Sequence, residues 1–142
     1  AGDIHFSKKV ECDVENVRVP SMILQPVVEN AVNHGIRNID WEGHIDLSVE
    51  RWNDHIEISV RDNGLGMTGE QIQRVLSKKV HSSSGEGDST GIGMNNVISR
   101  LELYYERDGL MEIYSEGEGM GTEVVINIPL ERSEKNVQNP DC

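Results

Sequence analysis

The chain has 142 residues, a formal net charge of −12 and a pI of about 4.7. Nucleic acids and anionic membrane surfaces are excluded as partners, because proteins bind both through clustered Lys and Arg, which an acidic chain lacks. Cys12 and Cys142 lie at opposite ends of the chain, so neither a disulfide framework nor a zinc site is indicated. The length suits one domain, and the excess of Val and Ile over Ala favours a sheet.

The first predicted element is an edge strand over residues 4–12, whose even-numbered apolar side chains indicate one buried face. A helical pattern follows over residues 20–34. Pro26 interrupts it, because proline removes a helical hydrogen bond, so we expect a short first turn and then a helix that begins near Pro26. Gly35 stands where a left-handed residue would cap the end of this helix.

The middle of the chain predicts a β-hairpin and a short helix. Apolar residues alternate over 44–52 and again over 55–60, with Asn-Asp between them, which is typical of two strands joined by a tight turn. Residues 69–76 have a short helical pattern. The Ser- and Gly-rich residues 77–90 have little to bury, so we expect a mobile loop there.

A third helix and a second hairpin complete the predicted domain, which comprises residues 1–131. The helix starts at Gly93, and its apolar residues recur at helical spacing to form one face: Met94, Val97, Ile98, Leu101, Tyr104 and Tyr105. Residues 110–115 and 122–128 alternate as strands around a glycine-rich turn. The polar residues 132–142 are expected to form a disordered tail.

Glycine concentrates in two clusters, DNGLGM (residues 62–67) and GIGMNN (residues 91–96), each of which leads into a predicted helix. Glycine lets a ligand approach the backbone closely, and a helix N-terminus presents unpaired N–H groups to an anion. An ordinary turn explains either cluster taken alone. The preceding helix, however, carries Glu29, Asn30 and Asn33 on one polar arc. Asparagine is a poor helix former, and its side-chain oxygen is a ligand that Mg²⁺ accepts.

These motifs, in this order, resemble the ATP-binding domain of bacterial sensor histidine kinases, within the GHKL superfamily. LQPVVENAVNHG resembles the N box, DNGLGM the G1 box and GIGMNNVISRL the G2 box, and the wording is most similar to LytS/YesM-like kinases. The resemblance covers residues 4–130. It implies the Bergerat fold, a two-layer α/β sandwich in which about three helices cover one face of a mixed, mainly antiparallel sheet. A flexible lid would close over ATP.

The resemblance implies that Asn30 places its side-chain oxygen on a Mg²⁺ ion that bridges the phosphates of ATP. Asn33 and His34 would lie near the phosphates. A chain of net charge −12 offers few cations to set against a triphosphate. We therefore expect a strict requirement for a divalent metal.

An adenine pocket around DNGLGM is also implied. Asp62 would accept a hydrogen bond from the exocyclic amino group of adenine, whereas guanine has a keto oxygen there, so ATP would be selected over GTP. Gly64 and Gly66 would let the backbone pass close to the base, and Met67 would pack near it. Thr122 would support Asp62 through its hydroxyl group.

In the G2 box, Gly91 and Gly93 would bring backbone N–H groups to the phosphates at the start of the helix, with Ile92 and Met94 as further nucleotide contacts. The loop before this box would be the ATP lid. Lys79 is a candidate phosphate contact in the lid, and a solvated surface charge is the alternative explanation for it.

Pro26 stands where ATPases of this superfamily carry a water-activating Glu, one helical turn before the metal-binding Asn. Proline cannot accept a proton, so we expect slow intrinsic hydrolysis. Glu29 is then the nearby carboxylate that could assist catalysis.

None of the five histidines lies in a predicted helical acceptor motif. A histidine kinase transfers the γ-phosphoryl group of ATP in line to an imidazole. The resemblance therefore implies the catalytic domain of a protein-histidine kinase, which would not autophosphorylate alone. Its implied partners are ATP, the dimerisation and phosphoacceptor helices of the same kinase, and a response regulator. The domain would be cytoplasmic without touching the membrane, and its parent protein anchored in a bacterial membrane.

Two alternatives remain open from the sequence. An anti-sigma-factor serine kinase has the same fold and a similar length, but its pattern carries Glu where this chain has Pro26. A non-catalytic nucleotide-binding module would signal by lid closure alone. The presence of Asn30 and of both glycine clusters weighs against the second alternative.

Overall fold

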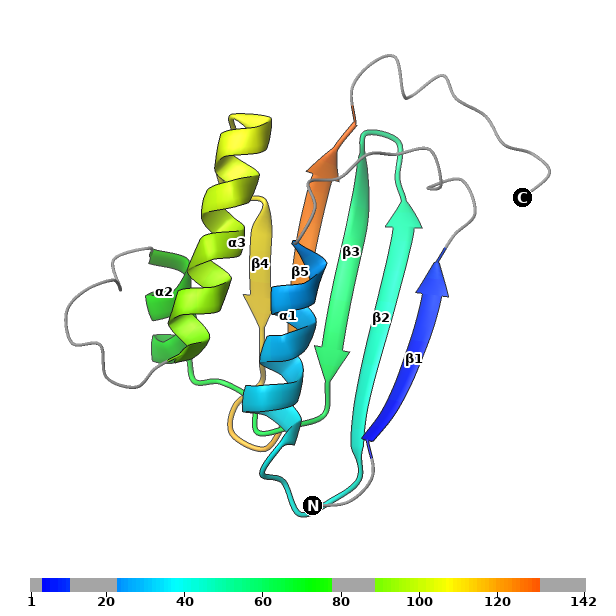
Figure 1. Cartoon of the computed structure of the whole chain (residues 1–142), viewed down its shortest axis with the longest axis vertical. Helices are drawn as coiled ribbons and strands as arrows, with labels where there is room; N and C mark the ends of the chain where they lie inside the picture. The colour runs from blue at the N-terminus through cyan, green and yellow to red at the C-terminus, as the bar shows by residue number, and fades with distance from the viewer. Residues whose placement is uncertain (1–3, 11–22, 78–88, 131–142) are drawn as a thin grey trace.

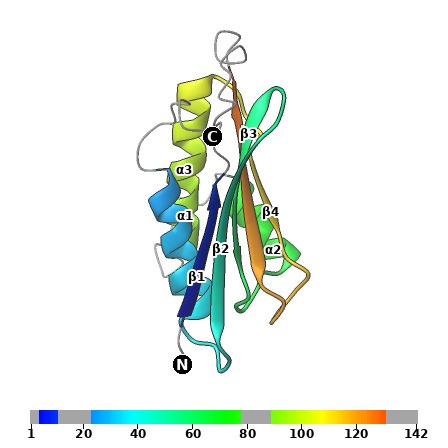
Figure 2. The same ribbon diagram turned by 90° about the vertical axis from the view of Figure 1, so that its right-hand side faces the viewer.

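The structure is a computed structural model that describes residues 4–10, 23–77 and 89–130. The helices and strands in these ranges form two layers, with α1 (Leu24–Asn30) and α3 (Ser89–Tyr105) side by side over one face of a sheet (Figures 1 and 2). The predicted two-layer α/β sandwich is confirmed.

The sheet has five strands in the order β1-β2-β3-β5-β4 (Figure 1). They are β1 (Ile4–Val10), β2 (Gly43–Arg51), β3 (His55–Asp62), β4 (Met111–Tyr114) and β5 (Thr122–Pro129). β1 pairs with β2 in parallel, whereas the other neighbouring strands pair antiparallel. A mixed, mainly antiparallel sheet with two hairpins was predicted and is confirmed.

The helical segments pack their apolar stripes on the sheet. α1 runs directly into a π-helical segment, η2 (Ala31–Ile36), and α2 (Gly69–Ser77) packs against α3. Alternating strand residues meet the helices between the two layers. Eight of the largest fully buried side chains come from both layers: Val27, Ile45, Val60, Met94, Val97, Leu101, Ile126 and Ile128. No helix in the described ranges has both the length and the apolar character to span a bilayer.

The edge strand β1 lies where the alternation predicts, but the expectation of a buried face is wrong. Every residue of β1 is exposed, and Phe6 is exposed to 53%. Phe6 pairs with the fully buried Ile45, so its side chain points to the helix side of the sheet. The helices lie over the inner strands and do not extend over β1 (Figure 1). Cys12, predicted on the same face, lies outside the described residues.

Two helix boundaries differ from the predictions. α1 starts at Leu24 with Pro26 inside its first turn, and α3 starts at Ser89, four residues before Gly93. Tyr104, predicted on the buried face of α3, is exposed to 57%. The predicted tail and most of the predicted lid, with Lys79, lie outside the described residues.

Candidate functional site

Asp62 is a buried carboxylate at the end of β3. Its backbone pairs with Thr122, the first residue of β5, and the residue is only 6% exposed. Gly64 N–H donates to Asp62 Oδ1 over 2.9 Å. Burial raises the pKa of Asp62 from 3.8 to about 6, and hydrogen bonds from the backbone of Gly64 and Thr122 oppose that rise. The fold thus holds a strong hydrogen-bond acceptor inside at an electrostatic cost.

Two glycines allow η2 to approach Asp62. A Cβ atom at Gly35 would lie 2.7 Å from the carboxylate of Asp62, and one at Gly64 would lie 1.9 Å from the Gly35 carbonyl oxygen. Leu65 N–H donates to the same carbonyl over 2.9 Å. The prediction that Gly35 is a left-handed cap is wrong, because it lies within η2 and has no positive φ. Gly35 is needed for space, so that helix and carboxylate can meet.

Asp62 lines a cavity of about 460 Å³, a volume that suits a small-molecule ligand. The cavity is walled by the end of the first helix, the end of the sheet, the β3–α2 loop (residues 63–68), α2 and the β4–β5 turn (residues 115–121). The structure brings six of the predicted site residues together here: Asn30, His34, Asp62, Gly66, Met67 and Thr122.

Asn30, the last residue of α1, lines this cavity and has a side-chain oxygen without a partner in the part of the chain that the structure describes. Asn30 Oδ1 is buried and has no hydrogen-bond partner among the described residues. A buried acceptor left without a partner costs about 1–3 kcal/mol. Such a cost is explained where a ligand or an ion completes the hydrogen bonding or coordination.

The rest of the predicted polar arc does not reach the cavity. Glu29 is exposed, and its Oε2 accepts a hydrogen bond from Gln25 Nε2 over 3.0 Å. Asn33 lines a separate cavity beside the start of β1. Neither residue therefore lies beside Asp62. A projection onto a straight α-helix had implied that the whole polar arc would face one site.

The π-helical segment η2 explains the change of direction for Asn33, which lies within it, whereas Glu29 lies before it in α1. The hydrogen bonds of η2 span five residues, as in the one from Arg37 N–H to the Val32 carbonyl over 2.9 Å. Each residue then turns through a smaller angle than in an α-helix, so side chains drift away from the α-helical projection. In consequence His34, and not Asn33, lines the main cavity.

The second glycine cluster lies near the start of α3. Gly91 is among the first four residues of α3, whose N–H groups have no helical partner, and Gly93 is one residue beyond them. Ile92 lies between them. Met94 is 1% exposed in the core and does not line the cavity. The expectation that Met94 contacts nucleotide is therefore not supported by its position.

α2 supplies a wall of the cavity that sequence reasoning missed, with Gln71 and Arg74 among the lining residues. A capping box fixes the start of this helix. Thr68 Oγ1 accepts a hydrogen bond from Gln71 N–H over 3.1 Å, and Gln71 Oε1 accepts one from Thr68 N–H over 2.9 Å. The T-x-x-Q spacing was the signal that could have placed this helix, and with it Arg74 one turn later.

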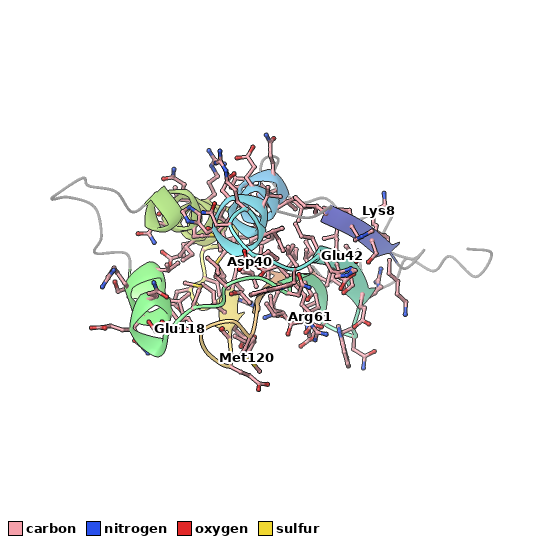
Figure 3. The ribbon with its side chains drawn as sticks, turned by 90° about the horizontal axis from the view of Figure 1, so that it is seen from below. Lys8, Asp40, Glu42, Arg61, Glu118 and Met120 are labelled. Atoms are coloured by element: carbon pink, nitrogen blue, oxygen red, sulfur yellow. The ribbon has the colours of Figure 1, made fainter. Side chains whose placement is uncertain are left out.

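The β4–β5 turn forms a further wall that sequence reasoning did not assign to the site. Gly119 N–H donates to the Leu65 carbonyl over 2.6 Å, and Gly121 N–H donates to the Gly64 carbonyl over 3.1 Å. Figure 3 looks onto this end of the fold, where Glu118 of the turn lies on the α2 side. The signal was the glycine run GEGMG, because Gly119 and Gly121 both have positive φ.

Asn63 anchors the backbone just after Asp62 to the start of β2 and to the segment before it. Asn63 Oδ1 accepts a hydrogen bond from His44 N–H over 2.7 Å, and Asn63 Nδ2 donates to the Glu42 carbonyl over 2.9 Å. The Trp41 indole Nε1–H donates to the Asn63 carbonyl over 2.8 Å. These partners lie about 20 positions earlier in the chain, so the local sequence did not indicate them.

Residues 19–132 match the model of the family described as histidine kinase-, DNA gyrase B- and HSP90-like ATPases. The chain is 33% identical over 125 residues to the sensor histidine kinase YpdA of Escherichia coli, covering 83% of this chain and 19% of the relative. It is 30% identical over 133 residues to the sensor protein LytS of Staphylococcus epidermidis, covering 94% of this chain and 21% of the relative. The chain thus spans about a fifth of the length of these relatives.

Solved structures show the same fold. The nucleotide-free catalytic domain of the histidine kinase ThkA superposes with a TM-score of 0.62 at 19% identity, over 92% of this chain and 81% of that chain. The mycobacterial sensor histidine kinase MprB gives a TM-score of 0.60 at 19% identity, over 89% and 81%. The chain therefore belongs to the histidine kinase-, DNA gyrase B- and HSP90-like ATPase family, and its relatives within that family are LytS-like sensor histidine kinases.

Proposed function

We propose that this chain is the Mg-ATP-binding catalytic domain of a two-component sensor kinase and supplies the γ-phosphoryl group for autophosphorylation of a histidine elsewhere in that kinase. The observation that carries the proposal is a single cavity lined both by Asp62, a buried carboxylate, and by Asn30, whose buried amide oxygen has no hydrogen-bond partner among the described residues. Each of these groups costs the ligand-free fold free energy. A ligand that uses both explains why they are there.

Asp62 is the proposed acceptor for the exocyclic amino group of adenine. An ionised carboxylate can only accept hydrogen bonds, so it favours the amino group of adenine over the keto oxygen of guanine. Thr122, Gly66 and Met67 line the cavity around it, and Gly64 lets the backbone of the β3–α2 loop pass directly over Gly35. ATP is therefore the expected ligand, and GTP is expected to bind poorly.

Asn30 is the proposed ligand for Mg²⁺. Its amide oxygen is a hard, neutral donor with no hydrogen bond to give up, and Mg²⁺ takes one or two protein oxygens together with phosphates and waters. When bound, the metal would neutralise part of the charge on the transferring phosphate. Asn30 would thus set the position of the phosphate end relative to Asp62.

Other contacts to the phosphates are proposed from position alone. His34 lines the cavity one turn beyond Asn30, and Gly91 lies among the free N–H groups at the start of α3. Ile92 and Gly93 follow directly in the chain. Lys79, in the segment between α2 and α3, is proposed as a lid contact. Asn33 and Met94 are left out because they lie away from the cavity.

Transfer to histidine is proposed over hydrolysis because the cavity offers little to activate water. Among the described residues, Asp62 and Glu118 are the carboxylates that line it, and Asp62 is assigned to the base. Pro26 cannot accept a proton, and Glu29 is exposed and bonded to Gln25. Glu29 is therefore dropped as a catalytic candidate, and Glu29→Gln should leave phosphoryl transfer unchanged.

The wider assembly is proposed from the relatives, which are sensor histidine kinases. The acceptor histidine would lie on dimerisation helices of the same kinase, and a response regulator would receive the phosphoryl group. The parent protein would be anchored in a bacterial membrane with this domain in the cytoplasm.

Calorimetry on the chain with Mg-ATP, with Mg-GTP and with ATP in EDTA tests the binding part of the proposal. We expect Asp62→Asn to weaken ATP binding about tenfold or more, because an amide N–H₂ would face the amino group of adenine. Glu118→Gln is the matched control, since it removes a carboxylate from the same cavity and should leave the affinity unchanged. Equal ATP affinity in the wild type and Asp62→Asn would contradict the adenine assignment.

A further inference from the structure

Ser115, the residue after β4, joins three separate backbone positions through one hydroxyl group. Ser115 Oγ accepts hydrogen bonds from Met67 N–H over 3.0 Å and from Gly117 N–H over 3.3 Å. It donates to the Gly121 carbonyl over 2.7 Å, with the Gly117 carbonyl at 3.4 Å as a longer alternative. A hydroxyl offers one hydrogen and two lone pairs, so these contacts use all of its hydrogen-bonding capacity.

The bonded positions belong to two walls of the cavity. Met67 lines it from the β3–α2 loop, and Gly119 and Thr122 line it on either side of Gly121. Ser115 does not line the cavity and is half-buried behind these walls. Its hydroxyl therefore acts on the cavity through the backbone of other residues.

The backbones of the two walls are so close together that there is no space between them for a side chain at Gly66. A Cβ atom at Gly66 would lie 2.1 Å from the Gly117 carbonyl oxygen and 3.1 Å from Ser115 Oγ. Backbone hydrogen bonds from Gly119 to Leu65 and from Gly121 to Gly64 cross the same gap. The Ser115 hydroxyl adds a side-chain bridge at the Met67 end, and Met67 is the residue proposed to pack near adenine.

We propose that Ser115 is a positioning residue for nucleotide binding, which holds the β3–α2 loop and the β4–β5 turn at the separation that adenine requires. The proposal rests on the proposed function, because it takes the cavity as the adenine site. It assigns to Ser115 no contact with the nucleotide. Losing the hydroxyl deprives two backbone N–H groups and one carbonyl of a partner, so the walls should separate and the adenine contact should loosen.

Two substitutions of equal shape test the hydroxyl itself. Thr and Val are nearly isosteric, and both suit the end of a strand, but only Thr keeps the hydroxyl. We expect Ser115→Val to raise the Kd for Mg-ATP about tenfold and Ser115→Thr to stay within about threefold of the wild type. Amide hydrogen exchange without nucleotide provides a second readout. Met67 and Gly117 should exchange faster in Ser115→Val than in Ser115→Thr.

Ser59→Val is the matched control for an ordinary structural hydroxyl, because Ser59 Oγ donates to Glu123 Oε2 over 2.7 Å in the same sheet and outside the cavity. It should leave ATP affinity unchanged even if it lowers stability. Equal ATP affinity and equal Met67 exchange in the Val and Thr variants would overturn the role of Ser115. A wild-type chain that fails to bind Mg-ATP would instead overturn the proposed function, while the exchange comparison would still decide whether Ser115 holds the walls.

Discussion

Asp62 illustrates how burial of a single carboxylate affects both stability and binding. Its pKa is raised to about 6 in the folded chain from an ordinary value of 3.8, so the fold binds this proton more tightly than the unfolded chain does. By linkage, the favourable contribution of Asp62 to the free energy of unfolding is present below the lower pKa and is lost as pH rises through the higher one. Asp62 thus makes the nucleotide-free domain less stable at neutral pH than at acidic pH.

ATP binding should have the opposite pH dependence. We expect the affinity for Mg-ATP to weaken as the pH falls below about 6, because a protonated carboxyl presents a donor to the amino group of adenine. Calorimetry between pH 5 and pH 8 measures this. Asp62→Asn is the control, because it removes this carboxylate and leaves the nucleotide and the other groups that line the cavity unchanged. The same pH dependence in the wild type and Asp62→Asn would contradict the assignment.

The Asn30→Ala variant should lose the effect of Mg²⁺ on ATP affinity without losing stability. Asn30→Ala removes an unpaired buried oxygen and improves helix propensity, so we expect the free energy of unfolding to stay the same or to rise by up to about 1 kcal/mol. The gain in ATP affinity on adding Mg²⁺ should disappear. Urea unfolding and calorimetry measure the two effects. Asn33→Ala is the control, because Asn33 lines a separate cavity and should leave ATP affinity unchanged.

At the scale of elements, local periodicity predicted the strands because alternation is a property of neighbouring residues. The pairing of Asp62 with Thr122 was not predictable in this way, because it joins strands of the two different hairpins and neither turn fixes it. The alternation did predict which side chains of β1 share a face. It could not predict that this face is left exposed, because the helices that would have to cover β1 lie far away in the chain.

The end of the first helix shows a different limit. Residue spacing assumes a constant α-helical turn, and no residue in AVNHGI announces that η2 shifts its hydrogen bonds by one position. The residue types of the site were therefore predictable from motifs, whereas the choice of His34 over Asn33 was not. Ser115 and Trp41 were missed for a related reason, since each acts through backbone atoms distant in the chain.

The contact between η2 and β3 gives a prediction at this scale. Gly35→Ala should lower the free energy of unfolding by about 1–3 kcal/mol, although Ala favours helices, because its Cβ would lie 2.7 Å from the Asp62 carboxylate. Gly69→Ala at the start of α2 has no atom within 4 Å of the added Cβ and should leave stability unchanged or slightly raised. Equal unfolding midpoints in urea for the two variants would show that the helix moves aside freely.

At the scale of the whole molecule, the net charge of −12 acts on a ligand that is itself an anion. Without metal, the chain and ATP repel each other, and salt screens that repulsion. We therefore expect the weak residual binding of ATP in EDTA to strengthen as ionic strength rises from about 20 mM to about 200 mM, the reverse of a nucleic-acid binder. Calorimetry or equilibrium dialysis measures the trend. Binding that weakens with salt would mean that local cations such as Arg74 outweigh the net charge.

The hydrogen bond from Trp41 to Asn63 gives the protein an optical probe of its own. Trp41 lies just before β2 beside the β3–α2 loop, and Trp52 lies just after β2, where it stacks on His55. A strand of nine residues separates them by roughly 30 Å. In a Trp52→Phe variant, the remaining indole would report on the β3–α2 loop through its hydrogen bond to Asn63, although Trp41 itself lines the separate cavity that Asn33 also lines. Its emission wavelength and quenching by iodide would follow ligand binding in a cuvette, with no dye attached and no labelled nucleotide.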